Sequence, residues 1–490
     1  MMARPECYKP IQRCLTLADL IEGLGGTHPA GLDLPVNLVL DSRKAEPGTV
    51  FLAFRGEHVD GHAFVGDALA RGAVAAVVDA ALPLAGVPLN ISILDLTQAP
   101  AAVAVDTPVI IRVPDVLQGL QRAAAFWRRQ FDVRVIGITG SVGKTTTKEV
   151  TTRVLQRRYR VLHSTGSYNN EIGLPLTLLQ LTSEHEVVVL EMGMYVRGDI
   201  RGLAEIARPQ MGILTNVEPV HAERAGTLEN IALGKRELVE ALPPAPEGVA
   251  ILNYDDPRVR AMAEVTQARV FTYGLDSRAD LWADEVESLG LEGIRARLHA
   301  GHESVDVRAP LLGRHSVHTL LRAAAVGLAL GLSWQEIIAG YQTPGAQLRL
   351  VSVPGPQQTL VLDDTYNSSP PSALAALNLL ADLGGRGIAV LGDMLELGDY
   401  EEEGHLKVGC RVAVVAEQLV AVGSRGALIA RGALSCGMSP ERVHAVGSNA
   451  EALACLLAVL EPHSVILVKG SRAMHMEEIV QALARAAGEQ

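Results

Sequence analysis

Short apolar runs recur along the chain, and each ends in polar residues before a stretch with helical periodicity. Four of these runs lie in the middle of the chain: VRVIGITG, EVVVLEMG, QMGILTNV and GVAILNYDDP. Apolar runs separated by helices predict buried parallel strands. In open sheets of this kind, functional residues gather at the carboxyl ends of the strands. Those ends carry Lys144, Glu191, His221 and Asn253.

The same alternation extends to both ends of the chain. LTLADLIEGL and HAFVGDALARG predict helices near the start, and VNLVLDSR, TVFLAFRG and AVAAVVDA predict strands. A weaker strand-like segment, 280–308, precedes a long apolar helix, HSVHTLLRAAAVGLALGL. Further strands are predicted in TLVLDDTYNSSP, GIAVLGDM, QLVAVG and SVILVKGSR. At roughly 150 residues per domain, the pattern predicts a three-domain α/β protein. Its parts are a small N-terminal α/β domain (1–108), a central parallel-sheet domain (109–342) and a C-terminal Rossmann-like domain (343–490).

The stretch from Val135 to Val150, VIGITGSVGKTTTKEV, joins a strand to a helix through a glycine-rich turn. This arrangement points backbone N–H groups at a phosphate, with Lys144 reaching the outer phosphates and the Thr145 hydroxyl able to bind Mg²⁺. The strict phosphate-loop pattern has a glycine at the position of Ile138, and here Gly140 supplies the early glycine instead. A turn that merely links two elements is the alternative, but the flanking strand and helix favour nucleotide binding.

Composition narrows the class of protein. The chain of 490 residues is 48% hydrophobic and 20% charged, which is enough apolar sequence for a sizeable core. A net charge of −12 argues against a nucleic-acid partner. The sequence has neither a signal segment nor an apolar run of about 18 residues, so we expect a cytoplasmic protein without a membrane span. The five cysteines (Cys7, Cys14, Cys410, Cys436 and Cys455) form no CxxC pair, and we expect reduced thiols rather than a disulfide framework or a zinc site.

Other polar residues are candidates for ligand contact. Glu191 ends a strand beside the phosphate loop, which suits a Mg²⁺ ligand, although a helix cap is the alternative. His221 suits metal or phosphate contact, or has no special role, and the pattern around Lys235 is that of a surface lysine. The stretches 363–367 and 469–472 each follow a strand, and their polar residues suit ligand binding or a capped turn.

Four stretches together resemble the Mur ligase family, the ATP-dependent amino-acid ligases of peptidoglycan synthesis. They are LDSRKAEPGTVFLAFRGEHVDGHAF, TGSVGKTTTKE, SYNNEIGLPLTLL, and the C-terminal signature LDDTYNSSPPSALAAL with LGDMLELG and ILVKGSR. The resemblance covers nearly the whole chain. The sequence differs from the family pattern at two places. Ser368-Ser369 stands where the family usually has Ala-Asn, and Met-Gly-Met-Tyr after Glu191 replaces the commoner x-Gly-Ala-Asn.

The resemblance implies roles for individual residues. It implies that the catalytic groups are Lys144, Glu191, His221 and Lys235. The metal ligands for two Mg²⁺ ions would be Thr145, Glu191, His221 and Lys235, the last as a carbamate. The ATP contacts would be Gly140, Ser141, Val142, Gly143, Lys144, Thr145, Thr146, Asn253, Arg349, Asp364, Tyr366 and Asn367. The substrate contacts would be Ser42, Arg43 and His62 for the UDP-sugar, together with Asn170, Glu171, Lys469, Ser471 and Arg472.

The resemblance also implies a reaction. ATP would phosphorylate the terminal carboxylate of UDP-N-acetylmuramoyl-tripeptide, and the amine of D-alanyl-D-alanine would attack the acyl phosphate. A monomer is expected, and the third peptide residue, diaminopimelate or lysine, is left open. One alternative is a sister ligase that adds a different amino acid, which the NNEIG and LELG stretches disfavour. The other is a non-catalytic ATP-binding scaffold, which the intact catalytic set disfavours.

Overall fold

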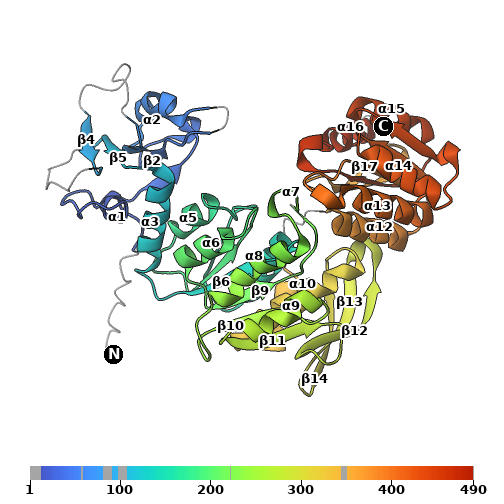
Figure 1. Cartoon of the computed structure of the whole chain (residues 1–490), viewed down its shortest axis with the longest axis horizontal. Coiled ribbons are helices and arrows are strands. Elements are labelled where there is room, and N and C mark those ends of the chain that lie inside the picture. The colour runs from blue at the N-terminus through green and yellow to red at the C-terminus, as the bar shows by residue number, and fades with distance from the viewer. Residues whose placement is uncertain are drawn as a thin grey trace, which may run out of the picture. The chain divides into compact units, whose positions relative to one another are not determined.

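The computed structural model describes residues 13–56, 59–80, 91–97, 107–220, 222–343 and 350–488. Their strands form three sheets of five, nine and six strands, with helices between the strands (Figure 1). The predicted α/β class is therefore confirmed. By packing, the chain divides into two compact units. One contains Met1–Gly137, Tyr159–Gly193 and Asp199–Gln210, and the other contains Ile138–Arg158, Met194–Gly198 and Met211–Gln490.

The first sheet is parallel throughout, in the order β1-β2-β3-β5-β4. Its strands are β1 (Asn37–Val39), β2 (Thr49–Leu52), β3 (Ala75–Val78), β4 (Ser92–Asp95) and β5 (Val109–Arg112). The helices around it are α1 (Leu17–Gly23), η1 (Ser42–Lys44), η2 (Gly61–Phe64), α2 (Val65–Ala70) and α3 (Val116–Arg128). Every residue of β2 and β3 is buried, as expected for parallel strands covered on both faces. Because β5 belongs to this sheet, the sheet continues past residue 108.

The second sheet has the order β14-β13-β12-β11-β10-β9-β6-β8-β7. Its strands are β6 (Arg134–Thr139), β7 (Val161–His163), β8 (Val187–Glu191), β9 (Met211–Leu214), β10 (Val249–Asn253), β11 (Arg269–Gly274), β12 (Leu281–Ser288), β13 (Ile294–Ala300) and β14 (Glu303–Ala309). The four predicted central strands are confirmed as β6, β8, β9 and β10. The weak segment 280–308 is three strands, and its β12–β14 pairs are antiparallel with one face partly exposed, which explains its mixed polarity.

Helix α4, which follows the phosphate loop, packs closely against two later helices. The helices of this region are α4 (Lys144–Leu155), α5 (Gly173–Leu178), α6 (Asp199–Ala207), α7 (Ala222–Ala225), α8 (Leu228–Glu240), α9 (Pro257–Ala261), α10 (Val317–Ala329) and α11 (Trp334–Tyr341). A Cβ atom added at Gly340 would lie 2.5 Å from the Cα of Val154, so only glycine allows α11 to approach α4. Helix α10 also contacts α4, and this contact brings α10 close to the phosphate loop.

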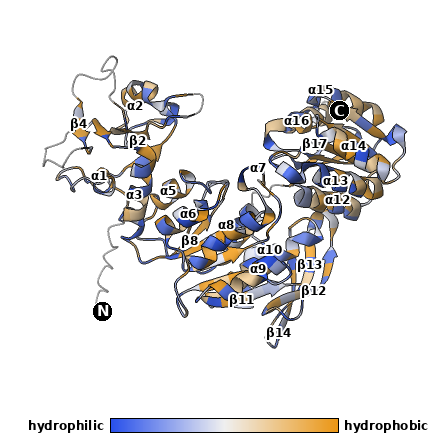
Figure 2. Ribbon diagram, viewed as in Figure 1, coloured by the Kyte–Doolittle hydropathy of each residue, from blue (hydrophilic) through white to orange (hydrophobic). Residues whose placement is uncertain are grey.

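The third sheet, in the order β15-β16-β20-β17-β18-β19, is parallel except for the edge strand β15. Its strands are β15 (Val351–Pro354), β16 (Leu360–Asp364), β17 (Gly387–Gly392), β18 (Gln418–Val422), β19 (Val443–Val446) and β20 (Val465–Lys469). The helices are α12 (Pro370–Leu383), α13 (Glu401–Val415), α14 (Gly426–Ser435), α15 (Asn449–Val459) and α16 (Glu477–Gly488). Hydrophobic residues lie on the strands and on parts of the helices (Figure 2). Val390 packs with α15 and α16, and Leu391 packs with α12, α13 and α14, so each face of the sheet has its own core.

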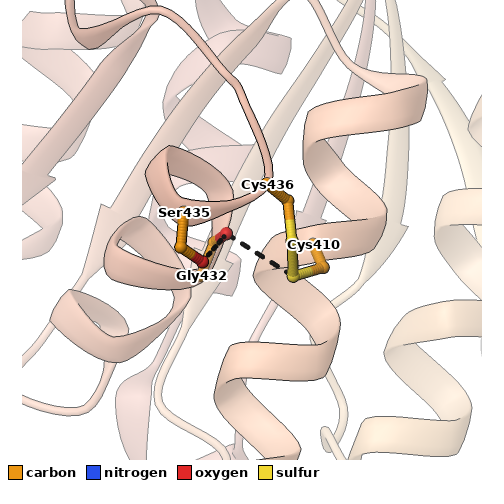
Figure 3. The surroundings of a disulfide bond; sticks show 4 residues. All are labelled: Cys410, Gly432, Ser435 and Cys436. Carbon is orange, nitrogen blue, oxygen red and sulfur yellow. Dashed lines mark hydrogen bonds between the residues drawn. A yellow bond between two sulfur atoms is a disulfide. The ribbon is translucent and has the colours of Figure 1, made fainter.

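Cys410 on α13 and Cys436 after α14 form a disulfide (Figure 3). The prediction of reduced thiols was therefore wrong for this pair. The two cysteines are 26 positions apart and carry no motif, and close helix packing brings them together. A Cβ atom at Gly409 would lie 2.1 Å from the carbonyl oxygen of Ile429, so glycine lets α13 and α14 approach. Cys14 and Cys455 are free thiols, and Cys7 lies outside the described residues.

Candidate active site

The phosphate loop depends on two glycines with positive φ. Gly140 has φ +141°, and a Cβ atom there would lie 1.8 Å from Oγ1 of Thr215. Gly143 has φ +87° and directly precedes α4. The first N–H groups of a helix have no partner within the helix and point along its axis, where they can bind an anion. The backbone at Gly140–Thr145 therefore has the form that a phosphate site requires.

The segment after β9 holds the loop in place. The N–H of Ser141 donates to the carbonyl oxygen of Asn216 at 3.0 Å, and the N–H of Val142 donates to Oδ1 of Asn216 at 2.9 Å. The Ser141 hydroxyl donates to the carbonyl oxygen of Glu218 at 2.8 Å. Sequence reasoning missed Asn216, although its place just after a buried strand was the signal that could have found it. These hydrogen bonds to the segment after β9 hold the loop in its conformation.

Two lysines lie near this loop with different surroundings. Nζ of Lys144 donates to the carbonyl oxygens of Gly140, at 2.8 Å, and Ser141, at 3.3 Å. Lys235 on α8 is only 5% exposed, so the interpretation of a surface lysine was wrong. Burial lowers the pKa of the Lys235 ammonium well below its usual range, and the charge of Lys144 lowers it further. Lys235 is thereby shifted toward the neutral amine, which is a nucleophile.

Thr145 and Asn253 are both buried at the same end of the strands. Nδ2 of Asn253 donates to the carbonyl oxygen of Thr215 at 2.8 Å, and its Oδ1 accepts the N–H of Asp255 at 3.1 Å. The Asn253 amide therefore links the end of β10 to Thr215, the residue that packs against Gly140. Thr146, in the first turn of α4, is partly exposed.

Glu191 ends β8 and is fully buried, and its Oε1 accepts Nδ2 of Asn169 at 2.9 Å. Nearby in sequence, Oδ1 of Asn170 accepts the N–H of Gly173, and the carbonyl oxygen of Glu171 accepts Nε2 of Gln121. His221 and Arg349 lie outside the described residues. Within the part of the chain that is described, His, Cys, Asp and Glu side chains form no group of three or more that could hold a metal ion. The metal roles therefore stay predictions.

The N-terminal candidates lie on two short turns that both pack against α2. Ser42 is buried, and Arg43 is exposed and bonds both carboxylate oxygens of Asp41, at 2.9 and 2.8 Å. Hydrogen bonds from Arg43 lower the pKa of Asp41 to about 2. The buried imidazole of His62 accepts the N–H of Asp79 on Nε2, so Nδ1 carries the proton and donates to Asp60 at 2.6 Å.

The C-terminal candidates come together at the ends of β16 and β20. Nζ of Lys469 donates to Oδ2 of Asp364 at 2.6 Å and to the carbonyl oxygen of Asn367 at 2.8 Å. The Arg472 guanidinium lies 5.6 Å from the ring centroid of Tyr366, within cation–π range. The hydroxyl of Ser471 accepts the N–H of Leu395 at 2.8 Å. The structure therefore groups the residues that the sequence placed at two separate strand ends.

A glycine-rich loop between a buried strand and a helix, followed by a second α/β domain with a largely parallel sheet, is typical of nucleotide-binding proteins. The family described as "Mur ligase family, catalytic domain" matches residues 36–128, "Mur ligase middle domain" matches 138–327, and "Mur ligase, glutamate ligase domain" matches 348–472. The chain belongs to the Mur ligase family.

Individual relatives match almost end to end. A UDP-N-acetylmuramoyl-tripeptide–D-alanyl-D-alanine ligase of Synechocystis is 35% identical over 454 residues, covering 91% of each chain. A crystal structure of MurF from Acinetobacter baumannii is similar with a TM-score of 0.81 and 30% identity, covering 96% of this chain and 99% of that one. The MurF ligase of Thermotoga maritima in complex with ADP has a TM-score of 0.76 and 25% identity, covering 93% and 99%. No helix of the described residues has the length and apolar character needed to span a membrane.

Proposed function

We propose that this chain is an ATP-dependent amide ligase that joins D-alanyl-D-alanine to UDP-N-acetylmuramoyl-tripeptide, giving the UDP-muramoyl-pentapeptide of peptidoglycan synthesis. The observation that carries the proposal is the end-to-end likeness to a ligase of that name, 35% identical over 91% of each chain. The phosphate loop supports it, because Gly140 and Gly143 have positive φ in a turn that leads directly into the first residue of α4, Lys144, and backbone N–H groups at such a turn can bind a phosphate.

The chemistry explains why ATP is required. A carboxylate is a poor electrophile, so its oxygen first attacks the γ-phosphorus of ATP, and ADP leaves. The amine of D-alanyl-D-alanine then attacks the carbonyl carbon of the acyl phosphate. The tetrahedral intermediate expels phosphate, and the amine nitrogen loses its proton as the amide forms. The Lys144 ammonium stabilises the charge that develops on the transferred phosphoryl oxygens, and the loop N–H groups position the nucleotide.

Magnesium belongs to the same proposal. The groups proposed to hold it are the Thr145 hydroxyl, Glu191, His221 and a carbamate on Lys235. Bound there, Mg²⁺ would neutralise charge on the phosphate oxygens. A neutral Lys235 amine can attack CO₂ to give a carbamate and release one proton, and burial in this structure shifts that lysine toward the neutral amine. Three of these four donors are oxygens, which Mg²⁺ prefers, and the fourth is the imidazole nitrogen of His221.

The remaining site residues have proposed roles in the same reaction. The turns that carry Ser42, Arg43 and His62 are proposed to bind the UDP-sugar. Asn253, Arg349 and the Asp364–Asn367 turn are proposed to contact ATP. The other substrate contacts are proposed for Asn170, Glu171, Lys469, Ser471 and Arg472. A division into domains at 1–108, 109–342 and 343–490, a monomeric state and a cytoplasmic location complete the proposal.

One assay tests the function. Phosphate release is measured with ATP, Mg²⁺ and UDP-N-acetylmuramoyl-tripeptide, with and without D-alanyl-D-alanine. Release is expected only with both peptide substrates, together with a product heavier by one dipeptide residue. A panel of other amines is the control. Faster release with a single amino acid would indicate a sister ligase, and no release with any amine would leave a non-catalytic nucleotide-binding protein.

A further inference from the structure

Arg322 is a buried cation on the apolar helix α10. Arg322 is only 5% exposed, and it is the single arginine among the mostly apolar residues of α10. Nη2 donates to the Thr319 hydroxyl at 2.9 Å, while Nε is buried with no hydrogen-bond partner among the described residues. Within the part of the chain that is described, no carboxylate lies within 4.0 Å of this guanidinium. A buried charge without a counter-ion is costly, so its presence requires an explanation.

The position of Arg322 supplies that explanation. A Cβ atom built at Gly143 would lie 3.4 Å from Nη2 and 3.8 Å from Nη1 of Arg322. The guanidinium therefore lies against the residue that precedes Lys144, at the start of α4. An anion held by the phosphate loop would be within the range of this charge, because interactions between charges strengthen in a desolvated site.

The other neighbours of Arg322 cannot neutralise it. The ring centroid of Tyr273 lies 5.8 Å from the guanidinium carbon. The Tyr273 hydroxyl donates to the carbonyl oxygen of Leu214 at 2.8 Å, and burial raises the pKa of Tyr273 to about 12. The phenol is therefore neutral at physiological pH. Thr319 contributes a hydroxyl, which is also neutral.

Arg128 shows what a purely structural buried arginine looks like in the same chain. Its Nε donates to the carbonyl oxygen of Ala207 at 3.0 Å, Nη1 to Phe131 at 2.9 Å and Nη2 to Val133 at 3.1 Å. Each of its three nitrogens therefore has a backbone acceptor. Arg322 lacks this arrangement, although both side chains are nearly fully buried.

We propose that Arg322 is a further polyphosphate-binding residue, whose guanidinium is the counter-ion for the phosphates of the nucleotide held by the Gly140–Thr145 loop. The proposal rests on the nucleotide site of the proposed function. A guanidinium presents several N–H donors in a plane that matches phosphate oxygens, and charge-assisted hydrogen bonds of this kind are strong.

The test uses the full-length chain with Arg322→Met and Arg322→Lys. Binding of ATP, ADP, inorganic tripolyphosphate and adenosine is measured by calorimetry. Arg322→Met is expected to raise the Kd for the three polyphosphates by about tenfold to a hundredfold, and to leave adenosine binding unchanged. Arg322→Lys retains the charge and is expected to recover part of the affinity. In turnover, the KM for ATP should rise while the KM for the tripeptide stays the same.

The Tm without nucleotide provides a second readout, because Arg322→Met is expected to weaken polyphosphate binding without lowering the Tm. Without nucleotide, Arg322→Met removes an unpaired buried charge from an apolar helix, so its Tm should equal or exceed that of the wild type. The matched control Arg128→Met should lower the Tm without changing the Kd for tripolyphosphate. A Kd for tripolyphosphate within twofold of wild type in Arg322→Met would overturn the proposal, as would a loss confined to adenosine. A wild-type chain that binds tripolyphosphate through Arg322 yet forms no amide would refute the ligase function and leave this inference standing.

Discussion

Nζ of Lys469 lies 2.6 Å from Oδ2 of Asp364, at the point where β16 and β20 are in register. The lysine is 1% exposed, and it also donates to the carbonyl oxygen of Asn367. The pair therefore links the ends of two neighbouring parallel strands and fixes the turn that carries Tyr366. Both partners are buried, so neither charge can be solvated if the other is removed.

We expect Lys469→Met to lower the free energy of unfolding by about 3–5 kcal/mol, because it leaves the buried carboxylate of Asp364 without a partner. Asp364→Asn should destabilise similarly, and the double variant should cost less than the sum of the two. Urea unfolding of the four proteins measures this coupling. The control is Arg386→Ala, which removes the surface pairs of a 48% exposed arginine side chain with Glu417 and Glu461. Because these groups are exposed, the variant should cost less than about 1 kcal/mol. Equal effects of Lys469→Met and Arg386→Ala would contradict the buried-pair argument.

The two loop glycines are expected to differ in their tolerance of a side chain. At Gly143, alanine meets its nearest atom, on Arg322, at 3.4 Å, so the main cost is the positive φ, about 1–2 kcal/mol. At Gly140, alanine also overlaps Oγ1 of Thr215 at 1.8 Å and its backbone nitrogen at 3.0 Å, which adds about 1–3 kcal/mol. Thermal unfolding should therefore give a lower Tm for Gly140→Ala than for Gly143→Ala. The reverse order would mean that contact with Thr215 does not prevent a side chain at position 140.

The sequence was sufficient to predict the strands that lead to the site. Strands β6, β8, β9 and β10 are buried on both faces, so they appear as continuous apolar runs that end in polar residues. The phosphate loop was equally visible, because its glycines and lysine have fixed local spacing. The sequence alone therefore places Lys144 and Asn253 at the carboxyl edge of a sheet.

Residues whose role depends on tertiary packing could not be found in this way. Arg322 lies far from the loop in sequence, and only the contact of α10 with α4 brings it to Gly143. A single arginine in a run of leucine and alanine was the available signal. The Cys410–Cys436 disulfide likewise depends on glycines that let two helices approach, and no cysteine spacing encodes that approach.

The disulfide gives a stability prediction. It closes a loop with a sequence separation of 26, which restricts the unfolded chain and should stabilise the fold by about 3 kcal/mol. Cys410→Ser, or treatment with a reductant, should therefore lower the Tm, and reductant should have no further effect on the variant. Mass spectrometry of alkylated protein under non-reducing conditions should find Cys14 and Cys455 modified but Cys410 and Cys436 protected. Labelling of all four under these conditions would contradict the assignment.

The buried Lys235 predicts a pH dependence of stability. Its pKa is lowered in the folded state by burial and by Lys144, whereas in the unfolded chain it is about 10.4. Between these two values the unfolded state binds more protons, so the free energy of unfolding rises with pH until the unfolded lysine also loses its proton. In CO₂-free buffer, Lys235→Met should therefore be more stable than wild type at neutral pH, and the difference should shrink toward pH ~10.4.

Bicarbonate distinguishes the carbamate from the free amine at the same position. If Lys235 reacts with CO₂, added bicarbonate should raise the Tm of the wild type, because the reaction consumes the buried amine and places an anion near the Lys144 charge. Lys235→Met cannot react and should show no change. Lys44→Met, at an exposed lysine, is the control and should behave as wild type under both conditions. The opposing result is that bicarbonate changes the Tm of neither the wild type nor Lys235→Met. It would exclude the carbamate and leave Lys235 as a buried neutral amine.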